Sequence, residues 1–158
     1  MPVRLSAVGK EYGPVVYAVG REKVKEYATA VGETSSLHLD TSAARAAGYD
    51  DVVAPPMFAV VYQSPAVMLG LVDPEVGIDF AMMVHSRQEF RWERVIVAGE
   101  ELTTRATVRS IEEKGGMGFY AFEAMTTDAG GGTVCNGIWN MIDRGLGDEP
   151  ADVANVVS

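Results

Sequence analysis

The residues with obvious chemical potential are concentrated in one stretch, GETSSLHLDTSAARAAGYDDVVAPPMF, residues 32–58. It holds His38, one of only two histidines in the chain, with Glu33 five residues before it and Asp40 two residues after it. An imidazole titrates close to neutral pH, and a nearby carboxylate can orient its ring and hold a water molecule. His38 and Glu33 are therefore a candidate pair for general acid–base catalysis.

Each of these residues also has a purely structural explanation. His38 can be an ordinary loop histidine, and Glu33 can be a solvent-exposed glutamate at the end of a helix. Asp40 is best explained as the N-cap of a short Ala-rich helix, because its carboxylate can accept from free N–H groups. Ser35 and Ser36 can contact a substrate or a water molecule, or they can simply close a turn. Both explanations stay open on sequence grounds.

A third feature follows this loop, where Pro55 and Pro56 begin an almost wholly apolar segment. Proline favours the first positions of a helix, where its missing N–H costs nothing. Free N–H groups at a helix N-terminus attract anionic oxygen atoms, so Met57 and Phe58 are candidate substrate-binding residues. We place Tyr62, about one turn further along the same segment, in the same group.

Composition limits the classes of partner. The chain has 158 residues, a net charge of −9, 47% hydrophobic residues and 22% charged residues, which predicts one ordinary globular domain. An acidic chain repels phosphate backbones and anionic membranes, so neither nucleic acid nor membrane is an expected partner. One cysteine, Cys135, excludes an internal disulfide, and with two histidines it leaves little for a metal site. With no signal peptide and no long apolar run in the sequence, we expect a cytoplasmic protein.

Helical periodicity is confined to the first half of the chain. Residues 15–19 predict a short strand, 21–32 an amphipathic helix and 41–48 a short Ala-rich helix. Residues 55–71 are apolar almost all round, which is typical of a helix buried on most sides. Pro65 lies inside this segment, so we expect a kink or a break near Gln63 and Ser64.

The second half changes to a period of two. The Gly-rich joints VAGE, KGGMG and AGGG suit hairpins, so the four segments they separate predict a run of antiparallel strands. The segments are residues 80–95, 101–114, 118–129 and 132–144. Together with the apolar helix they predict an α+β fold in which one antiparallel sheet wraps around one long central helix. We expect a single domain over 1–145 and a loose tail over 146–158.

This order of elements and motifs resembles the hot-dog fold of the MaoC-like dehydratases and (R)-specific enoyl-thioester hydratases. The family motif runs Asp-x-Asn-Pro-[Leu/Ile]-His-x-Asp, then Ala and Gly-[Tyr/Phe], then a His-Gly-Met turn that opens the central helix. A second match is FRWERVIVAGEEL, which is similar to the family's Phe-x-x-Pro-Val-x-x-Gly-Asp-x-Leu. The APP turn and REKVKEYA look most like the N-terminal-type, FAS1-like dehydratase branch. The residues that match the first motif are His38, Asp40, Ala44, Gly48 and Tyr49.

The sequence departs from the family motif at three places. Glu33 stands where the family has Asp, Ser35 and Ser36 where it has Asn-Pro, and Pro55-Pro56 where it has His-Gly. In the family, the glycine N–H helps to hold the thioester oxygen. Proline has no N–H, so another donor, such as that of Met57 or one from a partner chain, must replace it.

The resemblance implies an (R)-specific 3-hydroxyacyl-thioester dehydratase or enoyl-thioester hydratase. Such a hydro-lyase of fatty acid metabolism acts on acyl-CoA or acyl-carrier-protein substrates without a cofactor. His38 and Glu33 would be its catalytic residues, in a homodimer or a heterodimer with another hot-dog chain. We favour this function narrowly, because a pure scaffold has little need of His38.

Two alternatives remain. The chain can be a non-catalytic acyl-binding subunit of a heterodimeric hydroxyacyl dehydratase whose partner supplies the Asp/His dyad. It can also be a thioesterase or a small-molecule-binding module. The thioesterase is the least favoured, because the segment 55–71 contains no Asp or Glu.

Overall fold

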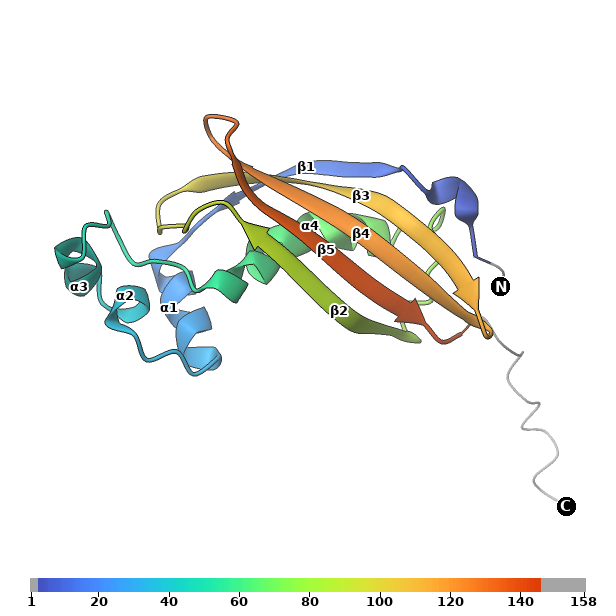
Figure 1. Cartoon of the computed structure of the whole chain (residues 1–158), viewed down its shortest axis with the longest axis horizontal. Helices are drawn as coiled ribbons and strands as arrows, with labels where there is room; N and C mark the ends of the chain where they lie inside the picture. Colours follow the sequence, from blue (N-terminus) through green and yellow to red (C-terminus); the bar gives the residue numbers. More distant parts are fainter. Residues whose placement is uncertain (1–2, 146–158) are drawn as a thin grey trace, which may run out of the picture.

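The computed structural model describes residues 3–145, and the predicted tail 146–158 lies outside the described residues. The expected α+β architecture, one antiparallel sheet against a central apolar helix, is confirmed (Figure 1). The helices are η1 (Leu5–Ala7), α1 (Arg21–Ala30), α2 (Ser36–Leu39), α3 (Thr41–Ala46), η2 (Pro56–Phe58) and α4 (Ala59–Leu71). The strands are β1 (Glu11–Ala18), β2 (Met83–Trp92), β3 (Glu101–Lys114), β4 (Met117–Asp128) and β5 (Thr133–Asp143).

The five strands form one sheet in the order β1-β3-β4-β5-β2, with every neighbouring pair antiparallel. Two of the three expected hairpins are confirmed, β3–β4 and β4–β5. In the first, Lys114 pairs with Met117 around Gly115 and Gly116, both at positive φ, as a tight two-residue turn requires. The third expected hairpin, between β2 and β3, is wrong. Strand β2 pairs with β5 instead, at the edge of the sheet opposite β1.

The expectation near Gln63 and Ser64 was a kink or a break; the central helix α4 is continuous, so there is no break. Proline removes the N–H that would normally bond the carbonyl of Val61, four residues earlier. The hydroxyl of Ser64 donates to that carbonyl instead, at 3.4 Å. The helix lies close against the sheet at Gly70, where an added Cβ would lie only 2.5 Å from the Phe122 ring. Burial against the sheet, with this local replacement, favours an unbroken helix over a break.

The hydrophobic core has two halves that meet at a layer of polar side chains. The site-side half surrounds the start of α4 and includes Phe58, Tyr62, Ile96, Leu102 and Val134. The far half surrounds the end of α4 and includes Val67, Leu71, Val108, Phe122 and Met141. Between them lie the fully buried Gln63, Thr104 and Thr126, which we call the polar layer.

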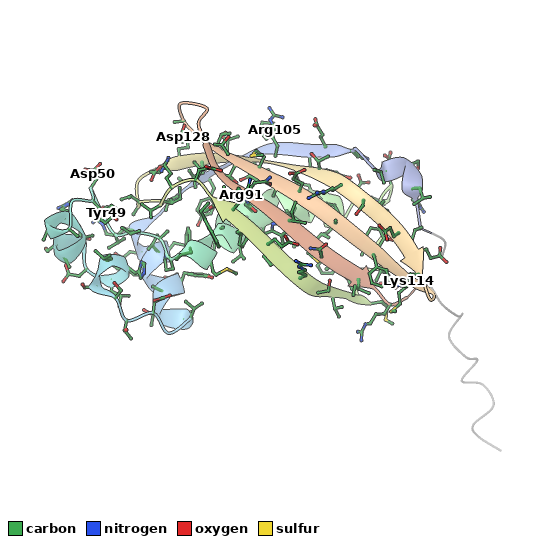
Figure 2. All side chains as sticks on the ribbon, in the orientation of Figure 1. Tyr49, Asp50, Arg91, Arg105, Lys114 and Asp128 are labelled. Carbon is green, nitrogen blue, oxygen red and sulfur yellow. The ribbon has the colours of Figure 1, made fainter. Side chains whose placement is uncertain are left out.

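Helices α1, α2 and α3 form an overhang beside the N-terminal end of α4, at the opposite end of the molecule from the β3–β4 turn (Figure 1). Figure 2 shows Tyr49 and Asp50 at the tip of this overhang and Lys114 at the other end of the sheet. Asp40 caps α3 as predicted, accepting from the N–H groups of Ser42 and Ala43 at 2.7 and 3.1 Å. The single-turn helix α2 was not expected, because four residues show no periodicity.

Candidate functional site

A pocket of about 550 Å³ opens where the overhang meets the start of α4. Its walls come from three parts of the chain: the overhang, the segment that leads into α4, and the connector that follows β2. Most of its surface is apolar, and a few polar groups converge on it, which is typical of small-molecule sites. The lining residues are Leu37, His38, Tyr49, Val53, Ala54, Pro55, Pro56, Tyr62, Trp92, Glu93, Arg94, Val95 and Ile96.

His38 is held in this pocket by the main chain. Its Nδ1 lies 2.6 Å from the carbonyl oxygen of Val53, and the N–H of Val53 donates to the carbonyl of Leu37 at 2.9 Å. A carbonyl can only accept, so Nδ1 carries a proton and the neutral ring has its lone pair on Nε2. A half-buried imidazole in this state can accept a proton from a bound substrate or water.

The carboxylate expected beside His38 is not part of the pocket. Glu33 follows α1, its N–H donates to the carbonyl of Ala28 at 2.8 Å, and its side chain is exposed. Ser35 caps α2, its hydroxyl accepting from the N–H of Leu37 at 3.3 Å, and Ser36 is exposed at the first position of that helix. Of the four overhang residues expected to be catalytic or substrate-binding, the structure brings only His38 to the pocket wall.

The three residues expected at the start of the central helix are placed differently from one another. Tyr62 lines the pocket, is almost fully buried, and has its pKa raised by that burial. Phe58 lies in the site-side core, with its ring edge-to-face against Tyr27 at 5.4 Å. Met57 is 45% exposed and does not line the pocket. Of these three side chains, only that of Tyr62 lines the pocket.

The Pro55-Pro56 turn leaves few main-chain donors near the pocket. The N–H of Phe58 donates to the carbonyl of Pro55 at 2.9 Å, and the indole N–H of Trp92 donates to the carbonyl of Pro56 at 2.8 Å. Because the two prolines have no N–H, Met57 carries the remaining main-chain donor of this turn. A donor to a substrate oxygen can come from this N–H, from a wall side chain such as that of His38 or Arg94, or from another chain.

Three wall residues at the end of β2 and directly after it were not predicted: Trp92, Glu93 and Arg94. Arg94 is held by two carboxylates, at 2.7 Å from Glu100 and 3.2 Å from Asp128, and the bond with Glu100 raises the pKa of its guanidinium. An exposed Trp between charged residues in FRWERV was the available sequence signal, since such a residue often marks a binding surface.

The connector after β2 is tied to the segment that precedes α4. Val53 and Val97 form an isolated antiparallel bridge. The N–H of Ala54 donates to the carbonyl of Ile96 at 2.8 Å, and the N–H of Ala98 donates to the carbonyl of Val52 at 3.0 Å. The VAGE joint does form a turn, in which the N–H of Glu100 donates to the carbonyl of Val97 at 3.3 Å. The hairpin expectation is nevertheless wrong, because the chain before this turn pairs with residues 52–54 and not with β3.

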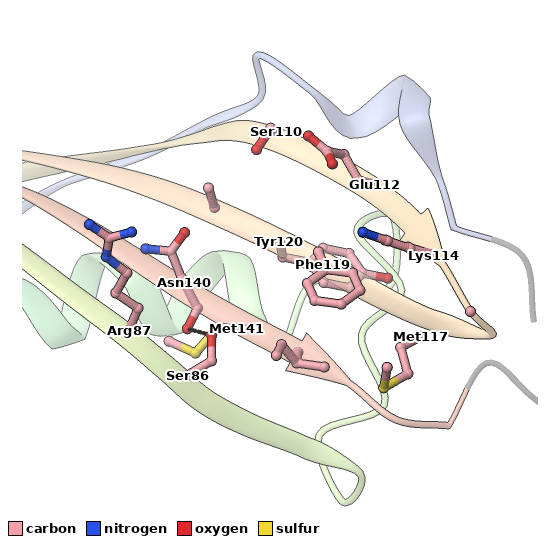
Figure 3. Close-up of a pocket in the computed structure, with 13 residues that line it drawn as sticks. Ser86, Arg87, Ser110, Glu112, Lys114, Met117, Phe119, Tyr120, Asn140 and Met141 are labelled. Carbon is pink, nitrogen blue, oxygen red and sulfur yellow. Dashed lines mark hydrogen bonds between the residues drawn. The ribbon is translucent and has the colours of Figure 1, made fainter.

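A larger cavity of about 640 Å³ lies at the opposite end of the molecule, near the β3–β4 turn. Figure 3 shows Arg87 and Asn140 on one side of it, Glu112 and Lys114 on the other, and Phe119 between them. It contains neither histidine, and the overhang with His38 lies at the far end of the sheet. The smaller pocket is therefore the better candidate for acid–base chemistry.

Two kinds of site find no support in residues 3–145. Over that range, no three His, Cys, Asp or Glu side chains are grouped so that they could hold a metal ion. No helix within the same range is both long enough and apolar enough to cross a membrane.

Comparison with solved structures confirms the hot-dog fold. A chain of the HadBC (3R)-hydroxyacyl-ACP dehydratase complex from Mycobacterium tuberculosis superposes with a TM-score of 0.77 at 25% identity, covering 89% of this chain and 99% of that one. A MaoC-like dehydratase superposes with a TM-score of 0.79 at 32% identity, covering 87% of this chain but 42% of that longer one. R-hydratase PhaJ1 from Pseudomonas aeruginosa shares the fold, with a TM-score of 0.69 at 16% identity, over 94% of this chain and 95% of its own.

Sequence comparison agrees with this result. A UPF0336 protein of Saccharopolyspora erythraea is 41% identical over 95% of this chain and 97% of its own length. Another, from Leifsonia xyli, is 42% identical over 92% of this chain and 98% of its own length. Residues 6–136 match the family described as the FAS1-like dehydratase domain region. The chain therefore belongs to the FAS1-like dehydratase family, within the MaoC-like group of hot-dog proteins.

Proposed function

We propose that this chain is the acyl-binding subunit of a two-chain hydro-lyase that interconverts (R)-3-hydroxyacyl thioesters and 2-enoyl thioesters. In this proposal the chain supplies the pocket for the acyl group, and a second hot-dog chain supplies the complete acid–base pair. The observation that carries it is the incomplete site: His38 lines the pocket, but the expected carboxylate of Glu33 is exposed outside it.

The chemistry explains why an incomplete site matters. Dehydration requires a base to remove the proton alpha to the thioester carbonyl and an acid to protonate the departing 3-hydroxyl, which leaves as water. It also requires donors for the negative charge that develops on the carbonyl oxygen. With Glu33 exposed outside the pocket, His38 lacks the carboxylate partner that the family motif provides for these steps.

The surface supports pairing with a second chain. Strand β2 is at an edge of the sheet, and an unpaired edge presents free N–H and C=O groups to a partner. Large apolar side chains are exposed on α4 and around β2, and such exposed groups mark protein interfaces. They are Met57, Met68, Leu69 and Val72 from η2, α4 and its C-cap, and Phe80, Met82, Val84, Trp92 and Val95 from β2 and its flanks. The similarity to a chain of the HadBC complex supports the same conclusion.

The second candidate is hydration and dehydration by this chain without another subunit type. It is favoured by the geometry of His38, whose Nδ1 is fixed by Val53 and whose Nε2 is free to act as a base. Glu93 lines the same pocket and would provide the carboxylate in place of Glu33.

One assay separates the two candidates. The chain is purified alone and with a second hot-dog chain that carries Asp-x-Asn-Pro-x-His, and hydration of crotonyl-CoA is followed by loss of absorbance of the conjugated thioester. We expect activity only from the pair, and we expect the His38→Ala and Glu33→Gln variants of this chain to retain it within about threefold. Activity of the lone chain that falls by about 10²-fold or more in His38→Ala would overturn the proposal. His85→Ala, at the chain's other histidine, is the matched control.

A further inference from the structure

The polar layer crosses the core directly behind the candidate pocket. Along α4, Tyr62 lines the pocket and the next residue is Gln63. The hydroxyl of Thr104 donates to the carbonyl of Tyr62 at 3.4 Å, so a residue of the layer is bonded to the main chain of a residue of the pocket wall. A group that extended from the pocket along α4 into the core would reach this layer where the site-side half of the core ends.

The layer is internally satisfied. The Gln63 amide donates to the Ala124 carbonyl at 3.1 Å and to the Thr126 hydroxyl at 3.2 Å, and its carbonyl accepts from the Trp139 indole at 3.0 Å. The hydroxyls of Thr104 and Thr126 lie 2.9 Å apart. A satisfied buried network is rigid, because displacing any member leaves polar groups without partners.

The opposing strand makes room for the amide. An added Cβ at Gly137 would lie 2.2 Å from Oε1 of Gln63, so only a residue without a side chain fits there. A glycine inside a strand weakens that strand and often marks a close approach of another group. Strand β5 is thus shaped to receive the Gln63 side chain, which independently shows that its position is specific.

We propose that Gln63 limits the length of the acyl chain that this pocket accepts. Short acyl groups fit in front of the polar layer, and longer hydrocarbon chains are excluded because they would have to displace Gln63 and leave its partners unpaired. The inference rests on the proposed function, since it assumes that the pocket holds an acyl thioester. It adds a chain-length preference and the residue that sets it.

The test measures binding rather than turnover. Saturated butyryl-, octanoyl- and dodecanoyl-CoA, which the proposed reaction cannot transform, are titrated into the full chain by calorimetry. We expect dodecanoyl-CoA to bind at least about tenfold more weakly than butyryl-CoA, a discrimination typical of a hydrophobic pocket with a fixed end. Gln63→Ala should bring the two affinities within about threefold of each other, because it removes the side chain that blocks the longer acyl chain. Gln63→Met keeps the volume but not the hydrogen bonds, so it should also narrow the ratio, whereas Ser64→Ala, a neighbouring control, should retain the wild-type ratio.

The two tryptophans give a second readout that needs no Gln63 variant. Trp92 lines the pocket and Trp139 binds Gln63, so their indole N–H resonances report on the pocket and on the layer separately. Butyryl-CoA should shift the Trp92 signal and leave the Trp139 signal in place. Equal affinity of the wild type for butyryl- and dodecanoyl-CoA, or an unchanged ratio in a folded Gln63→Ala, overturns the role of Gln63 while acyl binding stands. If no acyl-CoA binds, the acyl-binding function itself fails.

Discussion

Replacing Gly137 by alanine tests how tightly the core is built around the polar layer. The new Cβ would lie 2.2 Å from Oε1 of Gln63 and 2.9 Å from the ring of Phe90, both far below van der Waals contact. The Phe90 ring is half-buried and can swing aside, but three hydrogen bonds hold the Gln63 amide. Overpacking of a core costs about 1–3 kcal/mol, and losing the indole bond adds about 0.5–1.5 kcal/mol. We therefore expect Gly137→Ala to lower the free energy of unfolding by about 2–4 kcal/mol.

Urea unfolding of wild type and variant measures this difference, provided that the slope of the transition is unchanged. The decisive comparison is Gly137→Ala in a Gln63→Ala background, where the closest clash is gone. There the cost should fall to about 1 kcal/mol, and the coupling between the two sites should exceed about 1 kcal/mol. An equal cost in both backgrounds would refute the role given to the amide. Gly130→Ala, in an exposed turn at negative φ, is the control and should change stability by less than about 0.5 kcal/mol.

Three further predictions concern local structure. The Arg21 guanidinium lowers the pKa of Asp51 from 3.8 to about 2, so this pairing stabilises the fold above pH 4 and is lost as the pH falls through about 2. Asp51→Asn should therefore be less stable than wild type at neutral pH, and a difference in urea midpoint that persists at pH 2 would contradict this cause. Asp40→Ala should lower the free energy of unfolding by about 1 kcal/mol, because the α3 cap is lost. Asp40→Ser should keep most of the wild-type stability in the same assay, because serine can also cap a helix. Ser64→Ala should cost about 0.5–1.5 kcal/mol because it removes the donor to Val61; no change in thermal or urea stability would mean that this carbonyl needs no donor.

The sheet was largely predictable because its strands follow a simple period. Strand β3 spans Glu101–Lys114, the range expected from its alternation, and β4 and β5 differ from expectation by one residue at either end. Alternation and Gly-rich turns are local signals, so they locate strands well. The partner of β2 was predicted wrongly because pairing with β5 depends on a distant part of the chain, and the VAGE joint looks locally like any other hairpin turn.

The site was less predictable than the fold. The motif pointed to His38, which lines the pocket, but the side-chain direction of Glu33 depends on how the chain leaves α1, which no periodicity encodes. Gln63 was visible only as one polar residue in an apolar helix. The glycine in CNGIW was the stronger signal, since a glycine inside a strand often marks a close approach. Combining the two would have suggested that Gln63 and Gly137 meet.

The ladder between residues 52–54 and 96–98 has a consequence for the motions of the pocket. Both segments would be classed as loops, yet the amides of Ala54 and Ala98 are hydrogen-bonded across the ladder. These amides should resist hydrogen exchange as strand amides do, whereas ordinary loop amides exchange readily. The segments 52–54 and 96–98 cannot separate without breaking these hydrogen bonds, so together they form a stiff rim of the pocket. His38 is tied to the same rim through the carbonyl of Val53, so the part of the overhang that carries it should share this stiffness.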